Sequence, residues 1–433
     1  MKITHIHIER FRGFQNEDFE VGSLLTAIAG QNGTQKSTLL GIITQTFTLK
    51  TEDSMRVEKP LCGGSYISAF KDKFRLSPTF DKPKGHEWTI SFDAGMDDFT
   101  VESIKRTGDP NVRFWKKGAR QEGDGYISFP TIFLSLKRLV PVAEEAKIIT
   151  DDTLLTQEEL NEFKQLHNKI LIAQTPISSA TTITSKNKQS IGVSTELYDW
   201  NQNSMGQDNL GKIILALFSF KRLHDKYPRQ YKGGILAIDE MDATMYPASQ
   251  VELLKVLRKY ASKLNLQILF TTHSMSLLKA MDDLVQEVTK KEETANQAKI
   301  LYLKKVDDKI AIKQGVNFKG IQLDLNVVAE GNNRKKNRIT AYTEDKENIL
   351  FVKAILKSKA FVLDFVDVTL PCSTLMELVT KRVPAFIYPY SIVILDGDVR
   401  MNKNDLRKIN NADNILNALN ERCSMNDMPS ICI

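Results

Sequence analysis

The first residues of the chain alternate between apolar and polar, which predicts a strand over 2–9 followed by a turn at Arg12-Gly13. A second strand is expected after the turn. The run 24–29 is almost continuously apolar, as is typical of a strand buried on both faces of a parallel sheet. It ends at a glycine-rich loop that begins at Gly30, and a helix is expected from Ser37. The start of the chain therefore predicts two strands, a buried strand, a loop and a helix.

The next part of the chain shows shorter patterns. Residues 86–135 predict a small antiparallel lobe, because short alternating stretches are separated by Gly, Asp and Pro. These stretches are Trp88–Phe92, Phe99–Ile104 and Tyr126–Phe133. Residues 151–172 have apolar positions at helical spacing and predict a short helical arm. Residues 176–191 are rich in Ser, Thr, Lys and Asn, which indicates a mobile loop.

Strands and helices then alternate, which favours an α/β fold with a mainly parallel sheet covered by helices. The expected elements are a helix at 207–224, a strand at 234–238, a helix at 249–263, a strand at 266–270 and two short strands beyond 300. The polar, basic segment 331–338 is the predicted boundary between a domain at 1–330, with an insert at about 50–195, and a second domain at 339–433. In that second domain we expect a strand from 339, a helix at 345–357, a strand at 361–368, a helix at 373–382, a strand at 391–395 and a helix at 413–422.

Composition narrows the class of protein. The chain has 433 residues, enough for two domains, with 42% hydrophobic and 26% charged residues, as in ordinary globular proteins. No apolar run approaches the length of a membrane span, and the start lacks the apolar core of a signal peptide, so we expect a cytoplasmic protein. A net charge of +6 permits a nucleic-acid partner without requiring one. The cysteines are scattered and predict reduced thiols: Cys62, Cys372, Cys423 and Cys432.

The loop from Gly30 to Thr38 stands where the buried strand gives way to a helix. Backbone N–H groups at such a junction, with the positive end of the helix, can hold the β- and γ-phosphates of a nucleotide. Lys36 would neutralise the terminal phosphates, and the Ser37 hydroxyl would bind Mg²⁺. Gln35 stands where a phosphate loop usually has glycine before the lysine, which is expected to change affinity or turnover.

Polar side chains follow two later strands. Asp239 and Glu240 end an apolar strand and suit binding of Mg²⁺ and polarisation of the attacking water. An isolated Asp-Glu pair is also common as two solvated carboxylates. His273 follows the next apolar strand, and a lone histidine is more often structural. Its position at the carboxyl end of a parallel strand, beside the expected phosphate site, favours a catalytic role.

Together these motifs resemble the ABC-type ATPase superfamily, and within it the RecF and SMC branch. The opening Ile6–Phe14, the phosphate loop, and Ser204-Met-Gly206-Gln207 followed by a helix carry the resemblance. It implies a homodimer in which two copies sandwich ATP, because each signature segment caps the nucleotide of the other copy. It also implies catalytic roles for Glu240 and His273. The implied nucleotide-contacting residues are Arg12, Gly30, Asn32, Gly33, Thr34, Gln35, Lys36, Ser37, Thr38, Ser204, Gly206, Gln207 and Asp242, with Ser37 and Asp239 at the metal. No convincing glutamine precedes the signature in the segment 134–141.

A second group of acids follows strands near the end of the chain. Glu344 ends one predicted strand, and Asp396 and Asp398 close another. If both strands belong to one parallel sheet, these carboxylates would converge at its edge and could bind Mg²⁺ or Mn²⁺ for phosphodiester cleavage. The alternative is an Asp-Gly-Asp turn with solvated side chains. The spacing of these acids favours the metal site over the solvated turn because it matches that of a known domain family.

That segment is similar to a Toprim domain, with Glu344 as the first acid and Asp396 and Asp398 as the paired acids; Asp345 replaces the usual glycine. Toprim domains continue with a further strand and helix, so we expect this one to be incomplete at its end. An ABC head followed by Toprim is the layout of the OLD (overcoming lysogenization defect) nucleases, some encoded beside retron reverse transcriptases. The resemblance implies an ATP-regulated nuclease in anti-phage defence that cleaves DNA or RNA, with DNA favoured, and a partner that is a reverse transcriptase with its RNA or another defence component.

Other function classes stay open. One is a RecF-like or SMC-like ATPase for DNA repair or chromosome binding, in which the second acidic group is structural. A transporter ATPase subunit fits least, since its start would not resemble 6–14. Basic residues cluster at 334–338, at 137–138 and at 113–120, and each cluster is either solvated surface or a contact for a phosphate backbone.

Overall fold

In the computed structural model, residues 1–395 are described with several gaps. The gaps are 67–72, 78, 94, 106–111, 120–123, 141–146, 152–153, 174, 186–188, 331–338, 358–359, 361–362, 382 and 387–390. The chain divides into two compact units, Met1–Val327 and Val328–Ile433. Within the described residues, no helix has both the length and the apolar character needed to cross a bilayer.

The centre of the first unit is a six-stranded sheet in the order β16-β15-β3-β14-β13-β9. Its strands are β3 (Leu25–Gly30), β9 (Thr131–Leu134), β13 (Gly234–Ile238), β14 (Leu266–Thr272), β15 (Ala298–Val306) and β16 (Lys309–Lys313). All neighbours run parallel except β15 and β16. Alternate residues of β13 enter different cores, Ile235 on one face and Leu236 on the other. Burial on both faces explains why these strands are continuously apolar.

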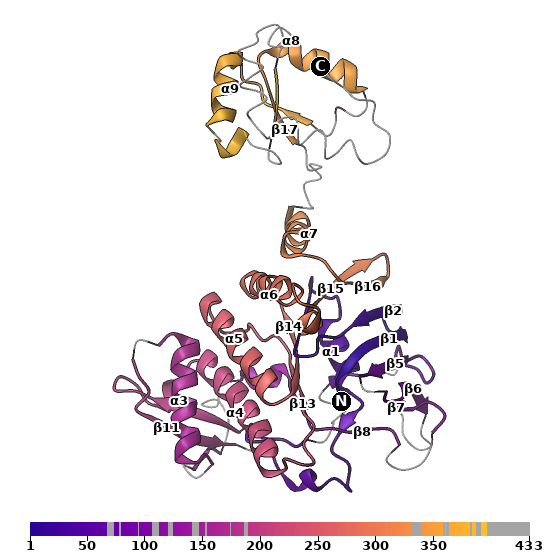
Figure 1. The fold of residues 1–433 in the computed structure, drawn as a ribbon, viewed down its shortest axis with the longest axis vertical. Coiled ribbons are helices and arrows are strands. Elements are labelled where there is room, and N and C mark those ends of the chain that lie inside the picture. Colours follow the sequence, from indigo (N-terminus) through magenta and orange to yellow (C-terminus); the bar gives the residue numbers. More distant parts are fainter. Residues whose placement is uncertain are drawn as a thin grey trace. The chain divides into compact units, whose positions relative to one another are not determined.

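Helices cover one face of this main sheet, as Figure 1 shows. They are α4 (Met205–Lys226), α5 (Pro247–Lys263) and α6 (Met275–Val288), and α3 (Gln157–Leu171) packs against α4 and α5. The other face packs on α1 (Lys36–Thr44), which lies between the main sheet and the N-terminal strands. Helix α7 (Phe318–Glu330) follows β16. Short 3₁₀ turns occur at Ser54–Val57, Leu136–Leu139, Trp200–Gln202, Glu292–Thr294 and Pro384–Phe386.

The predicted antiparallel lobe is present, and it includes the N-terminal strands. Its order is β2-β1-β5-β6-β7. The strands are β1 (Ile3–Phe11), β2 (Phe14–Glu20), β5 (Glu87–Phe92), β6 (Phe99–Lys105) and β7 (Val112–Lys116). Trp88 packs edge-on against Phe11 and Phe114, with ring centroids 5.7 and 5.1 Å away, so aromatic packing joins the strands across the lobe.

The prediction that 126–133 belongs to this lobe was wrong. Residues 127–128 form β8 (Ile127–Ser128), which pairs with β4 (Phe47–Thr48). Residues 131–134 form β9, which pairs in parallel with β13 at the edge of the main sheet. The buried side chains of Ile132 and Leu134 enter the core beneath the helices, and this burial places the strand there. The insert at about 50–195 therefore contributes a strand to the main sheet.

One further prediction in this region was wrong. The expected loop at 176–191 contains β11 (Ser179–Thr184) and the start of β12 (Gln189–Ser194), which form a sheet with β10 (Ile149–Asp151). Its threonines favour extended backbone, and Ile183 and Ile191 are buried. The helix predicted within 151–172 is confirmed as α3 (Gln157–Leu171), which packs against α4 and α5 with Phe163 fully buried.

The second unit has a small parallel sheet in the order β18-β17-β19. Its described elements are β17 (Ile339–Thr343), α8 (Lys346–Leu356), β18 (Leu363–Phe365), α9 (Cys372–Thr380) and β19 (Ser391–Ile394). Ala341, Val352 and Leu363 form its buried core. The predicted boundary segment 331–338 and the predicted helix at 413–422 lie outside the described residues.

Candidate functional site

The loop after β3 closes around the side chain of Lys36. The Lys36 ammonium donates hydrogen bonds to the carbonyl oxygens of Gly30, at 3.1 Å, and Gln31, at 2.9 Å. Gly30 has a φ of +152°, and a Cβ there would lie 2.4 Å from the carbonyl oxygen of Leu303, so only glycine fits. The Thr34 hydroxyl also donates to Gln31, at 2.8 Å. Asn32 and Gly33 are exposed at the tip.

Gln35 occupies a conformation that normally favours glycine. Its φ is +62°, in the left-handed region, which costs a non-glycine residue about 1–2 kcal/mol. Its side-chain Nε2 is 2.9 Å from where a Cβ would stand on Gly13, so Gln35 packs against the Arg12-Gly13 turn. Its Oε1 is buried and accepts no hydrogen bond from the part of the chain that the structure describes. The departure from glycine is thus accommodated by a contact with the first turn.

The phosphate loop meets the end of β13 through Asp239. The Ser37 hydroxyl donates to Oδ1 of Asp239 at 2.9 Å, and the Thr271 hydroxyl donates to the same oxygen at 2.7 Å. The amide of Glu240 in turn donates to the Thr271 oxygen at 2.6 Å. Parallel pairing of β3, β14 and β13 brings their carboxyl ends to one edge. A hydroxyl and a carboxylate side by side are the hard oxygen ligands that suit Mg²⁺.

Electrostatics show that the other predicted residues share this edge. Burial lowers the pKa of Lys36 to about 8, although the carboxylates of Glu240, Asp239 and Asp242 act to raise it. Burial, with the charge of Lys36, also lowers the pKa of His273. The His273 amide donates to Oδ1 of Asp242 at 3.4 Å. The structure therefore gathers the phosphate-loop lysine, the acids after β13 and the histidine after β14.

Arg12 reaches the start of α1 from the antiparallel lobe. Its Nη1 donates to the Thr38 hydroxyl at 3.3 Å, while Nε and Nη2 donate to both carboxylate oxygens of Asp81, at 3.0 and 2.9 Å. Burial alone would raise the pKa of Asp81, but hydrogen bonds from Arg12, the Ser77 amide and His86 lower it to about 2. The ion pair holds the guanidinium at the phosphate loop. Asp81 and His86 were missed from the sequence, because nothing near them resembles a motif.

The signature segment forms the beginning of α4. Ser204 is the N-cap, and its hydroxyl accepts from the Gln207 amide at 3.3 Å while Gln207 Oε1 accepts from the Ser204 amide at 2.8 Å. A Cβ on Gly206 would lie 2.5 Å from the carbonyl oxygen of Thr244, so glycine lets the helix approach the turn after β13. The exposed N-terminus of a helix favours anions.

Arg138 was predicted from the sequence to lie in a basic cluster that is either solvated surface or a phosphate-backbone contact, but the structure buries it. Arg138 lies in the segment where a glutamine was sought, and its side chain is only 2% exposed. It contacts both the start of α4 and the backbone of Glu240. Its contacts cross 71 and 102 residues of sequence, so no local signal could have identified them.

The second group of acids is described only in part. Glu344 directly follows β17, whose last residue pairs with Ile394 of the parallel strand β19. Asp396 and Asp398 lie outside the described residues, so their convergence with Glu344 stays a prediction. Asp345 caps helix α8, since its carboxylate accepts from the Asn348 amide at 2.9 Å. The basic segment 334–338 also lies outside the described residues.

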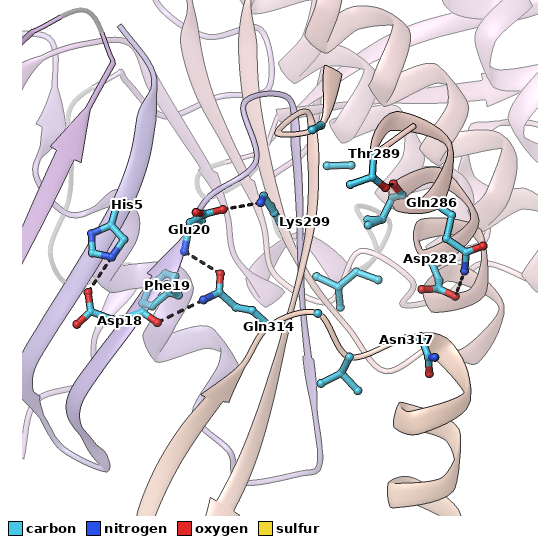
Figure 2. A pocket seen from close by; sticks show the side chains of 16 residues that line it. His5, Asp18, Phe19, Glu20, Asp282, Gln286, Thr289, Lys299, Gln314 and Asn317 are labelled. Carbon is cyan, nitrogen blue, oxygen red and sulfur yellow. Dashed lines mark hydrogen bonds and ion pairs between the residues drawn. The ribbon is translucent and has the colours of Figure 1, made fainter. Parts of the chain in front are cut away.

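A separate cleft of about 720 Å³ lies at the opposite edge of the main sheet (Figure 2). The residues that line this cleft include the start of β15. The phosphate loop follows the end of the parallel strand β3, so the two sites lie at opposite edges of the sheet. His5 lies 2.7 Å from Asp18, Lys299 pairs with Glu20, and Asp282 accepts a hydrogen bond from Gln286 at 2.9 Å. Because these side chains already have partners within the chain, the cleft indicates no particular class of ligand.

Comparisons with known proteins identify similarity to an ATPase domain in one part of the chain. Residues 136–278 match the AAA ATPase domain family, and this stretch contains the signature, the acids after β13 and His273. This part of the chain is thus an ATPase domain, which implies ATP binding. A search of curated proteins finds no significant match.

A search of solved structures also matches SMC head domains. The SMC head domain from Thermotoga maritima is 14% identical, with a TM-score of 0.41, over 73% of this chain and 100% of that one. An SMC head bound to the C-terminal winged-helix domain of ScpA is 14% identical, with a TM-score of 0.41, over 74% and 100%. An SMC head with an extended coiled coil, bound to the C-terminal domain of ScpA derived from Pyrococcus furiosus, is 12% identical, with a TM-score of 0.39, over 76% and 99%. TM-scores this low support no conclusion about fold or function.

Proposed function

We propose that this chain hydrolyses ATP at the carboxyl edge of the main sheet. The observation that supports this most directly is the 2.9 Å contact between the Ser37 hydroxyl and Asp239, beside the buried Lys36. It joins the phosphate loop to the acid after β13, which is the pairing that a nucleotide with its metal requires. The match of residues 136–278 to ATPase domains is independent support.

The chemistry follows from the position of each group. Lys36 and the loop amides bind the phosphates, and Arg12 contributes positive charge from the lobe. Mg²⁺, when bound at Ser37 and Asp239, would neutralise charge that develops on the phosphate oxygens. Glu240 polarises the attacking water. His273 contacts the γ-phosphate from the end of β14.

The proposed active unit is a homodimer with two nucleotides between its copies. Ser204 is exposed at the positive end of α4 and would bind the phosphate held by the other copy. Met205 and Tyr246 are large apolar residues near this face, 41% and 48% exposed, as expected for a surface that a partner covers.

The test is ATP hydrolysis by the wild-type chain and by Glu240→Gln, with light scattering after size-exclusion chromatography. Glu240→Gln keeps the site's shape but removes the base, so it should retain ATP and shift the chain to a dimer. Lys279→Ala, at an exposed position of α6, is the control and should behave as wild type. If ATP leaves the mass of Glu240→Gln unchanged, the sandwich dimer is wrong.

We further propose that the second unit is a Toprim-like nuclease of the OLD type, active on DNA in anti-phage defence in the cytoplasm. The position of Glu344 at the end of β17, beside the parallel strand that precedes Asp396, supports it. A reverse transcriptase with its RNA is the proposed partner. Plasmid cleavage with Mn²⁺ should be lost in Asp396→Ala. If both proteins bind DNA without cutting it, a RecF-like repair ATPase is the better account.

A further inference from the structure

We propose that Arg138 is a positioning residue, which fixes the turn that carries Glu240 to the start of the signature helix. This inference rests on the proposed ATP hydrolysis and adds a residue to it. Arg138 follows β9 in the turn Leu136–Leu139, and its side chain is 2% exposed. Strand β9 is the neighbour of β13, so Arg138 stands beside the end of the strand that leads to the catalytic acid.

The guanidinium of Arg138 donates hydrogen bonds to backbone carbonyl oxygens and to one side-chain amide oxygen. Nη2 donates to the carbonyl oxygen of Glu240 at 2.8 Å, and Nε donates to Oδ1 of Asn209 at 2.7 Å. Nη1 donates to the carbonyl oxygens of Leu134, at 3.3 Å, and Ser135, at 3.1 Å. One side chain therefore links β9, the turn after β13 and helix α4. A lysine has no planar fork and cannot reach these acceptors together.

Asn209 completes the link from the side of α4. Its Nδ2 donates to the carbonyl oxygen of Ala243 at 2.9 Å, while its Oδ1 accepts from Arg138. The turn after β13 is thus held at two carbonyls, those of Glu240 and Ala243. Asn209 lies five positions beyond Ser204, in the second turn of the helix that the signature begins. The start of the signature helix and the catalytic turn therefore form one hydrogen-bonded unit.

The turn after β13 contains two residues in an unfavourable backbone conformation. Glu240 has a φ of +50° and Thr244 a φ of +68°, both in the left-handed region that side chains other than glycine rarely adopt. Such conformations persist where surrounding contacts impose them. The Arg138 bond is made to the carbonyl of Glu240 itself, so it acts on the orientation of that residue's peptide and, through it, on where the carboxylate points.

Burying the positive charge of Arg138 is unfavourable for the stability of the fold. Burial lowers the pKa of Arg138 to about 10, against the carboxylates of Asp239, Glu240 and Asp242, which raise it. Apolar side chains of similar volume usually stabilise such positions at least as well as a buried charge does. A role in positioning explains the arginine better than a role in packing does. Its positive charge also balances the acids that gather at this edge.

The test compares Arg138→Lys with Arg222→Lys, which changes the same residue type on the far part of α4, where it pairs with Glu159 at 2.6 Å. The measurements are kcat for MgATP hydrolysis and Kd for MgATP. We expect kcat of Arg138→Lys to fall about 10- to 100-fold, as when a group that orients a ligand is lost, with Kd changed less than about 3-fold. Arg222→Lys should keep the wild-type kcat.

A double variant separates positioning from general damage. In the Glu240→Gln background, Arg138→Lys should cause no further loss of kcat, because it acts through Glu240. Asn209→Asp keeps the acceptor for Arg138 but loses the donor to Ala243, and it should lower kcat in the same non-additive way. If Arg138→Lys fails to fold, Asn209→Asp tests the positioning role in its place.

The failures are distinguishable. If the wild-type chain does not hydrolyse ATP, the proposed function itself is wrong. If the wild type hydrolyses ATP and kcat of Arg138→Lys equals that of Arg222→Lys, only the positioning role is overturned. If the fold-losses of kcat in Arg138→Lys and Glu240→Gln multiply in the double variant, the positioning role is also overturned.

Discussion

The two units of this chain each place an acid directly after a parallel strand, yet the surroundings of these acids differ. In the first unit Asp239 accepts two hydrogen bonds, from Ser37 and Thr271, and lies near the buried ammonium of Lys36. In the second unit Glu344 follows β17 as a partly exposed residue, and the acids proposed to join it lie outside the described residues. A strand end brings acids to one edge, but the neighbouring loops and helices decide what they can bind.

The largest expected effect separates the two sites. Glu240→Gln should lower ATP hydrolysis on the order of 10²- to 10⁴-fold, as expected for loss of a general base, and leave DNA cleavage at the proposed Mn²⁺ site of the second unit unchanged. Glu344→Gln should do the reverse, abolishing DNA cleavage while kcat for ATP stays at the wild-type value. Parallel assays of both activities on both variants check this. Equal loss of ATP hydrolysis in the two variants would contradict the assignment of separate sites.

Most of the main sheet was predictable from the sequence, but its edge strand β9 and the residues Asp81 and Arg138 were not. Strand β13 and the phosphate loop carry strong local signals, an apolar run followed by acids and a glycine-rich turn. Strand β9 is only four residues long, so its apolar run fits either sheet until its partner is known. Asp81 and Arg138 act through contacts with Arg12 and Glu240 that lie far away in sequence. Such contacts are decided by tertiary packing.

A smaller effect tests the close approach at the signature. Gly206→Ala would bring a Cβ to 2.5 Å from the carbonyl oxygen of Thr244, so backbone must move. We expect a loss of about 1–3 kcal/mol in the free energy of unfolding and a weakened response to ATP. Gly320→Ala is the control, because the nearest atom to its added Cβ is a side-chain methyl group of Val316, at 3.1 Å. Urea unfolding of both variants measures the difference.

The Asp81 ion pair should contribute stability that depends on pH. The folded pKa of about 2 lies below the ordinary value of 3.8, so the contribution is complete above about pH 4 and is lost as pH falls toward 2. Asp81→Asn should therefore cost on the order of 1–2 kcal/mol at pH 7, and the gap from wild type should narrow below pH 4. Urea unfolding across this range measures the gap; one that stays constant would exclude the ion pair as its cause.

The smallest effect concerns the second unit. Asp345 caps α8, and Asp345→Ala should cost about 1 kcal/mol of local stability. Amide hydrogen exchange across Lys346–Leu356 should become faster, whereas exchange across α4 should not change. Faster exchange in both helices would mean that the substitution acts on more than the cap.

The most direct test of the central claim is the binding of MgATP to the wild-type chain and to Lys36→Ala, measured by titration calorimetry. The account places the ammonium of Lys36 and the Ser37–Asp239 contact around one triphosphate, so wild type should bind one nucleotide per chain. Lys36→Ala should bind at least about 10-fold more weakly, since a charge-assisted contact is lost. Equal affinity in the two proteins would show that nucleotide binds elsewhere and would contradict the account.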